Sequence, residues 1–72
     1  MKIVAPKVNG RTVPNCLFIE DADGTKHCIS YMSDVAKLTP EGVYIEMQGD
    51  KYFSKTSNRH KNLFKKHYNI GV

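Results

Sequence analysis

Side chains that can bind anions or exchange protons are concentrated near the C-terminus. A run of hydroxyl and lysine side chains at positions 54–57 precedes a stretch rich in lysine, arginine, asparagine and histidine. With 3.6 residues per turn, residues 56–70 are predicted to form an amphipathic helix whose cations lie on one arc. Such an arc binds carboxylates or phosphates, and the predicted binding residues are Lys55, Arg59, Lys61, Asn62, Lys65 and Lys66. The alternative is a surface helix whose lysines serve solubility alone.

Arg59 is the cation that argues most for binding. In a helix capped by Thr56 or Ser57 and ended by Gly71, Arg59 falls in the first turn. The helix dipole disfavours a cation there by ~0.3–1 kcal/mol. A residue that costs stability locally is a candidate for contact with an anion. The hydroxyl groups of this segment could also hold a phosphate beside the exposed amides of the helix N-terminus.

The opposite arc of the predicted helix is apolar and should pack on a sheet. Its members recur at helical spacing and are His60, Leu63, Phe64, His67 and Tyr68. Both histidines are therefore predicted to be structural, with a ring nitrogen bonded to strand backbone or to a hydroxyl group such as that of Ser54. The predicted structural signature of the region comprises Ser54, Thr56, Ser57 and His60.

Neither catalysis nor metal binding is predicted. Ser54 and Ser57 lie near His60 in the sequence, but no third residue or oxyanion hole accompanies them. Cys16, Cys28 and the histidines show no CxxC, HxxxH or other zinc spacing. A chain of 72 residues also has little room for an enclosed pocket. We expect a domain that is not an enzyme and that uses no metal and no cofactor.

Charge is distributed unevenly along the chain, whose net charge is +4. Residues 1–36 hold four Lys or Arg and four Asp or Glu, whereas residues 37–72 hold seven and three. This excess predicts an anionic partner: an acidic surface of a host protein or of a protein–nucleic-acid machine, or nucleic acid itself. Because no secretory signal or membrane span is visible, we expect a cytoplasmic protein without a membrane partner. The small core also favours homo-oligomer formation as a source of stability.

The remainder of the chain predicts short strands joined by tight turns within a single domain, 1–72. Residues 1–15 are expected to form an edge hairpin or loop around Asn9-Gly10, and residues 16–54 a β meander. The predicted fold is α+β: an antiparallel sheet of four or five short strands with one C-terminal amphipathic helix packed across it. A small SH3-like barrel with an appended helix is the alternative.

The first hairpin of the meander has a predicted register. A two-residue turn at Asp23-Gly24 places Glu20 opposite His27 and Phe18 opposite Ile29. In this register Cys16 faces Tyr31 and lies too far from Cys28 for a disulfide. Both thiols are therefore expected to be free and buried.

The second half of the meander is predicted from alternation. Residues 34–38 form a short strand, and residues 43–48 alternate so that Val43, Ile45 and Met47 face the core. Tyr44 and Phe53 then lie on the open face, where their rings could stack on bases, although such aromatic residues more often serve core and cross-strand packing. Residues 51–54 return as a final strand before the helix.

Residues 29–66 contain a pattern of aromatic, hydroxyl and histidine positions. It comprises Tyr31, Val35-Ala36, Val43-Tyr44 and a signature from Phe53 to Asn62 that reads aromatic-Ser-x-Thr-Ser-x-x-His-x-Asn. This pattern resembles a group of small, mostly bacteriophage-encoded proteins of unknown function, in which Ser57 is usually a second threonine. The resemblance brings no established biochemistry. It implies a phage accessory protein, a class that includes many small proteins that bind host or defence factors.

Two functional hypotheses follow from these observations. In the first, a phage accessory protein binds a host or defence protein through its basic helix face and inhibits or redirects it. In the second, the same face binds the phosphates of DNA or RNA. We favour the first because only about six cations lie in the helical region and no base-reading element accompanies them.

Overall fold

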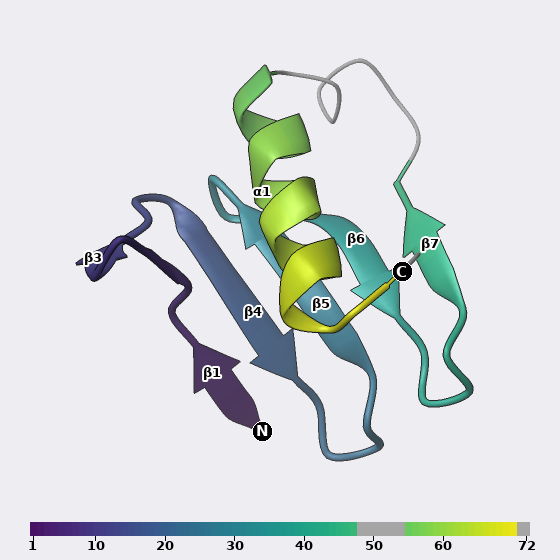
Figure 1. Cartoon of the computed structure of the whole chain (residues 1–72). Coiled ribbons are helices and arrows are strands. Elements are labelled where there is room, and N and C mark those ends of the chain that lie inside the picture. Colours follow the sequence, from purple (N-terminus) through teal and green to yellow (C-terminus); the bar gives the residue numbers. More distant parts are fainter. Residues whose placement is uncertain (48–54, 71–72) are drawn as a thin grey trace.

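The computed structural model describes residues 1–47 and 55–70, in which a helix lies across one face of an antiparallel sheet (Figure 1). The sheet has the strand order β1-β4-β5-β6-β7, and β2 and β3 form a separate two-stranded sheet. The elements are β1 (Lys2–Val4), β2 (Lys7–Val8), β3 (Arg11–Thr12), β4 (Cys16–Glu20), β5 (Lys26–Ser30), β6 (Ser33–Leu38), β7 (Tyr44–Glu46) and α1 (Lys55–His67). The predicted α+β fold is confirmed.

The hydrophobic core lies between α1 and the sheet. Its fully buried members are Cys16, Phe18, Cys28, Val35, Ala36 and Phe64. Phe18 and Phe64 meet edge to face with ring centroids 5.2 Å apart, a geometry that aromatic pairs prefer. Both cysteines are free and buried, as predicted. The hydrogen bond with Cys16, together with burial, raises the pKa of Cys28, so Cys28 is a protonated, structural thiol.

The register of β4 and β5 differs from the prediction by one residue. The backbone amide of Asp21 donates to the carbonyl of Thr25 at 2.8 Å, so the turn has three residues, 22–24, instead of two. Gly24 has a φ of 94°, which fits the left-handed third position of such a turn. Phe18 consequently pairs with Cys28, and Ile29 pairs with Leu17. Because a one-residue shift moves a side chain to the other face, Ile29 leaves the Phe18 side of the sheet.

The orientation of β7 is opposite to the prediction. Val43 is 54% exposed and Ile45 is also exposed, whereas Tyr44 and Glu46 lie on the side of α1. Tyr44 packs against Phe64 with ring centroids 6.2 Å apart, and its hydroxyl donates to Glu46 at 2.8 Å. The predicted return strand over residues 51–54 lies outside the described residues.

Helix α1 begins earlier than predicted and ends at a different residue. Thr56 and Ser57 lie inside it instead of capping it, and Ser57 is buried. At the C-terminus, Asn69 has a φ of 56°, and the Ile70 amide donates to the Lys65 carbonyl at 2.8 Å. This is the geometry of a Schellman motif. Asn69 therefore provides the left-handed residue that the sequence analysis assigned to Gly71.

The β2–β3 hairpin confirms the turn predicted at Asn9-Gly10. Val8 pairs with Arg11, and both turn residues have positive φ, 53° and 79°. Two positive values are the signature of the type I′ turn that matches strand twist. The Val13 amide also donates to the Pro6 carbonyl at 2.9 Å, which continues the pairing beyond the short strands. This hairpin stands beside α1, and the space between them forms the candidate site.

Candidate functional site

The predicted binding residues of α1 divide into two groups. Lys55, Arg59, Asn62 and Lys66 line a surface hollow together with Asn58 and Leu63. Lys61 and Lys65 instead approach Glu46 of β7, each with its Nζ 3.8 Å from a carboxylate oxygen. Lys65 also lies over the Tyr44 ring, 5.1 Å from its centroid. The structure thus brings together four of the six predicted residues and turns the other two toward the sheet.

The burial of Lys61 corrects the predicted faces of the helix. Lys61 is only 2% exposed, and the buried residues of α1 are Ser57, His60, Lys61 and Phe64. His67, predicted on the inner arc, is exposed. The physical reason is the carboxylate of Glu46, which provides an opposite charge at the sheet, since buried cations are tolerated when paired. Hydrophobic periodicity alone cannot show such a partner.

The start of α1 at Lys55 also changes the argument about Arg59. Lys55 occupies the first turn, which contains no acidic residue, and Arg59 lies in the second turn. Because the dipole effect falls off within the first turn, Lys55 carries more of this local cost than Arg59. The case for Arg59 therefore rests on its position in a cationic hollow.

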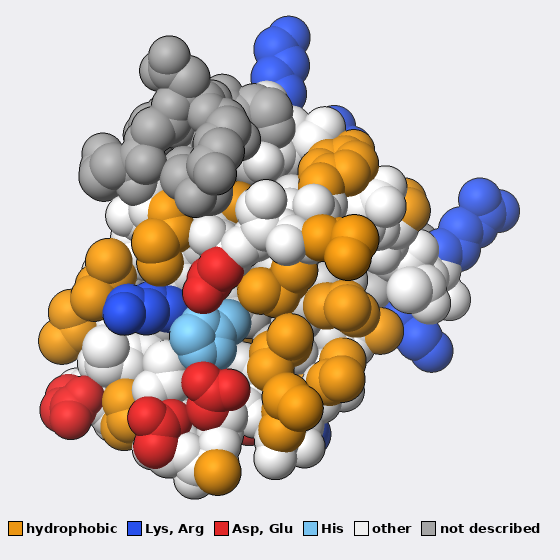
Figure 2. Space-filling view, turned by 180° about the vertical axis from the view of Figure 1, so that it is seen from behind, with side chains coloured by type: hydrophobic (Ala, Val, Ile, Leu, Met, Phe, Trp, Pro, Cys, Tyr) orange, Lys and Arg blue, Asp and Glu red, His pale blue; other side chains and the backbone are white. Residues whose placement is uncertain are grey.

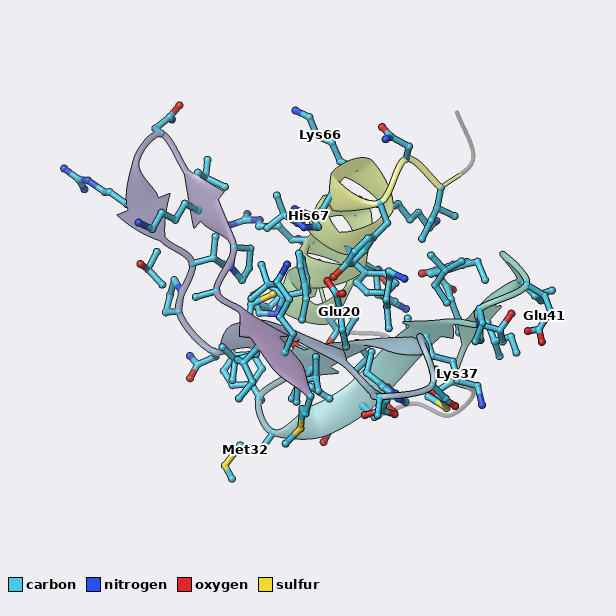
Figure 3. The ribbon with its side chains drawn as sticks, turned by 90° about the horizontal axis from the view of Figure 1, so that it is seen from below. Glu20, Met32, Lys37, Glu41, Lys66 and His67 are labelled. Atoms are coloured by element: carbon cyan, nitrogen blue, oxygen red, sulfur yellow. The ribbon has the colours of Figure 1, made fainter. Side chains whose placement is uncertain are left out.

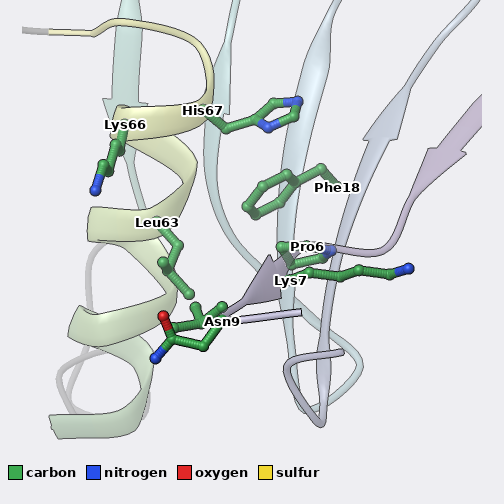
Figure 4. A pocket seen from close by; sticks show the side chains of 8 residues that line it. Pro6, Lys7, Asn9, Phe18, Leu63, Lys66 and His67 are labelled. Carbon is green, nitrogen blue, oxygen red and sulfur yellow. The ribbon is translucent and has the colours of Figure 1, made fainter. Parts of the chain in front are cut away.

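Two hollows lie between the β2–β3 hairpin and α1, and a third, lined by residues of α1 alone, adjoins them to complete a groove. Their volumes are about 380, 430 and 480 Å³, and Leu63 lines all three. In Figure 4, Leu63 reaches from α1 toward Asn9 of the hairpin, with Pro6 and Phe18 beside them. We call this surface the basic groove. Its cations are Lys7, Arg11, Lys55, Arg59 and Lys66.

The groove combines positive charge with an apolar lining. Among the described residues that line it, none is acidic, and its apolar side chains include Val8, Val13, Pro14 and Leu63. No carboxylate within residues 1–47 and 55–70 forms an ion pair with Arg59 or Arg11. Lys66 extends away from the sheet (Figure 3). Several like charges around an apolar surface create a positive potential that attracts an anionic partner.

Lys7 and Arg11 were missed by the sequence analysis. They lie in the segment whose charges balance overall, far from the helix in sequence. The only available signal was Asn9-Gly10, which predicted a hairpin flanked by two cations. Nothing local indicated that this hairpin would stand against α1.

His60 is buried and bonds to the hydroxyl group of Ser30 on β5, whereas Ser54, the example named from the sequence, lies outside the described residues. Its Nδ1 lies 2.8 Å from the Ser30 hydroxyl, and Ser57 lies 3.4 Å from the same oxygen. Burial, with a smaller contribution from the charge of Arg59, lowers the pKa of His60. A neutral ring therefore joins α1 to β5.

A second charged cluster lies on the sheet face opposite α1. Nε2 of His27 is 2.7 Å from Asp21 Oδ2, and Nδ1 is 2.9 Å from Asp34 Oδ2. Burial by itself lowers the pKa of His27, but the hydrogen bonds to both carboxylates and their charges outweigh it, so the pKa is raised. With an acceptor at each nitrogen, the ring is most stable as the doubly protonated imidazolium.

The two histidines predict opposite effects of pH on folding. The stabilisation from His27 is fully present below its unfolded pKa of ~6.5 and is lost as pH rises through the raised folded value. His60 acts in reverse, because lowering the pH below ~6.5 favours the unfolded state, which accepts its proton more readily. We expect His27→Gln to lower the free energy of unfolding more at pH ~5.5 than at pH ~9, as measured by urea denaturation. An equal loss at both values would contradict this role.

The described residues contain neither a candidate metal-binding group nor a membrane-spanning helix. Within them, no three His, Cys, Asp or Glu side chains form a group that could hold a metal ion. The one described helix, α1, lacks the length and apolar character needed to cross a membrane.

The comparisons with known proteins identify the family. No curated protein and no solved structure matches the chain. A family model does match, over residues 4–70, which include both the β2–β3 hairpin and α1 and so both walls of the basic groove. The chain belongs to the family described as a family of unknown function, DUF8033.

Proposed function

We propose that this domain is a non-enzymatic binding protein whose basic groove takes an acidic segment of another protein. The observation that carries the proposal is the combination of five cations with an apolar lining on facing walls. A segment with one aliphatic side chain flanked by Asp or Glu would fill the space around Leu63 and pair with the arginines. By binding this segment, the domain inhibits or redirects its partner protein.

The resemblance of residues 53–62 to phage-encoded proteins supports the choice of partner. Small accessory proteins of phages commonly act on host or defence proteins, and we propose such a protein as the target. The groove suits this role because charged rims raise association rates and set orientation, while an apolar centre supplies binding free energy.

Nucleic acid is the second candidate, and one observation favours it. Asn58 and Asn62 line the groove beside Arg59 and Lys66, and such side chains commonly bind phosphate oxygens. The aliphatic lining counts against it, because a phosphate backbone gains little from Leu63 or Val8. The two partners also differ in salt dependence, since nucleic-acid binding weakens steeply through counterion release.

Capture from host lysate, with and without nuclease, tests the proposal. We expect a retained protein whose recovery is unchanged by nuclease, and whose acidic segment binds as an isolated peptide. Replacing Asp and Glu in that peptide by Asn and Gln should abolish binding. Retention of nucleic acid alone, with a log–log salt slope near minus the number of phosphate contacts, would establish the second candidate instead.

Arg59→Ala is expected to remove most of the binding while leaving thermal stability unchanged or slightly higher. Arg59 lines two of the three hollows and is exposed, so its loss affects the partner and not the core. Lys37→Ala is the matched control, since Lys37 lies on the opposite sheet face as the register neighbour of His27. Isothermal titration with the captured segment measures both. Parent-like affinity of Arg59→Ala would refute the assignment of the groove.

A further inference from the structure

The sheet face that points away from α1, here called the outer face, carries an unusual group of aliphatic side chains. Ile3 pairs directly with Ile19, and Leu17 with Ile29, so these four residues form a block across β1, β4 and β5. Ile3 is 60% exposed and Leu17 is 39% exposed. Figure 2 shows this face, with hydrophobic side chains gathered beside acidic, basic and histidine side chains.

This composition differs from that of a sheet face that remains in water. Antiparallel sheets with one solvated face usually alternate apolar residues inward with polar residues outward. Here the inward positions Cys16, Phe18 and Cys28 alternate with outward aliphatic positions of the same strands. Contiguous apolar surface of this kind marks an interaction site. The described part of the outer face is thus suited to burial against a second layer.

We propose that a second copy of this chain covers the outer face, in a back-to-back dimer. The charge distribution selects this occupant. The basic groove carries one sign of charge and would repel its own copy, whereas the outer face carries both signs: Asp21 and Asp34 beside His27 and Lys37. Back-to-back packing places these mixed charges at a shared interface and the two grooves on opposite sides, which maximises the distance between the cationic surfaces.

The size of the face predicts a weak dimer. Five strands span about 24 Å and five residues about 17 Å, which gives about 400 Å² for each copy. The pair would bury about 800 Å², less than the ~1,200–2,000 Å² of stable specific interfaces. A symmetric dimer of this kind is reversible and depends on protein concentration. It would also present two grooves at once, so that a partner with two acidic segments binds more tightly than one segment does.

Light scattering coupled to gel filtration and sedimentation velocity test the proposal on the purified full chain. Between about 10 µM and about 1 mM, the range in which weak dimers form, the average mass should rise from one chain toward two. Ile3→Lys and Leu17→Lys should each hold the protein at the mass of one chain across the whole range. Both side chains are exposed in the single copy, so the variants retain the circular dichroism spectrum of the parent.

Asn58→Lys is the matched control, because it adds the same charge at an exposed residue of α1, on the side of the sheet opposite the outer face. It should dimerise like the parent. A parent protein that stays monomeric at every concentration, or Ile3→Lys and Leu17→Lys proteins that dimerise as it does, would overturn the proposal. Since the readout is mass, the result is independent of whether the groove binds an acidic segment.

Discussion

Replacing Phe64 by alanine is expected to unfold this domain. Phe64 is completely buried, and its ring meets Phe18 at 5.2 Å and Tyr68 at 5.0 Å between centroids. Truncating such a side chain costs about 3–5 kcal/mol. A core of this size supplies only ~3–5 kcal/mol of net stability, so the loss is as large as the whole free energy of unfolding.

Circular dichroism and urea denaturation measure this loss directly. We expect the Phe64→Ala protein to lack a cooperative unfolding transition at 25 °C, and Phe64→Leu to retain one with a lower midpoint. Leu63→Ala is the neighbouring control: Leu63 is partly exposed in the groove, so its truncation should leave a folded protein. A cooperative transition for Phe64→Ala near that of the parent would mean that α1 does not depend on this contact.

Elements governed by local chemistry could be predicted from the sequence, and the β2–β3 hairpin is the clearest case. Asn9 and Gly10 tolerate the positive φ values that a type I′ turn requires, and both adopt them. Asp23-Gly24 was misassigned because the same dipeptide also serves three-residue turns, in which only Gly24 needs positive φ. The difference of one residue decided which face Ile29 occupies.

The faces of β7 and α1 could not be predicted from periodicity, because each depends on the other. Hydrophobicity alone favours Ile45 inside and Glu46 outside, and it places Lys61 in water. The structure pairs Glu46 with Lys61 on the inner side, with Tyr44 against Phe64. An inward-facing charge is costly unless an opposite charge pairs with it, and here each of the two charges finds its partner on another element. A prediction that places either Glu46 or Lys61 on the wrong face therefore places the other on the wrong face as well.

For a related reason, only one of the two walls of the candidate site could be predicted from the sequence. The helix wall, with Lys55, Arg59, Asn62 and Lys66, follows from the local charge pattern. The hairpin wall, with Lys7 and Arg11, depends on a tertiary contact between segments about fifty residues apart. Local sequence patterns predict the hairpin, but they do not indicate which element it packs against. The basic groove is therefore a product of the fold and not of one motif.

The two-walled construction of the groove yields the prediction with the largest effect on binding. Arg11 and Arg59 come from opposite walls and line the same hollow. Reversing either charge, Arg11→Glu or Arg59→Glu, should weaken binding of an acidic segment by at least about tenfold, which corresponds to at least about 1.4 kcal/mol. Each reversal removes an attraction and adds a repulsion at the rim. The double variant should lose more affinity than either single variant, and because both arginines would contact one ligand, the two losses are not expected to be simply additive.

Lys37→Glu separates a local effect from one of net charge. It changes the total charge as much as Arg59→Glu, but it does so on the outer face, beyond a Debye length of ~8 Å in physiological salt from a ligand held in the groove. Isothermal titration should therefore give parent-like affinity for Lys37→Glu and a loss for both arginine variants. If all three single variants lost affinity equally, the partner would be sensing the charge of the whole molecule. If only Arg59→Glu did, the helix would bind without the hairpin. A comparable loss from Arg11 and Arg59, absent at Lys37, is the result that requires a groove with two walls.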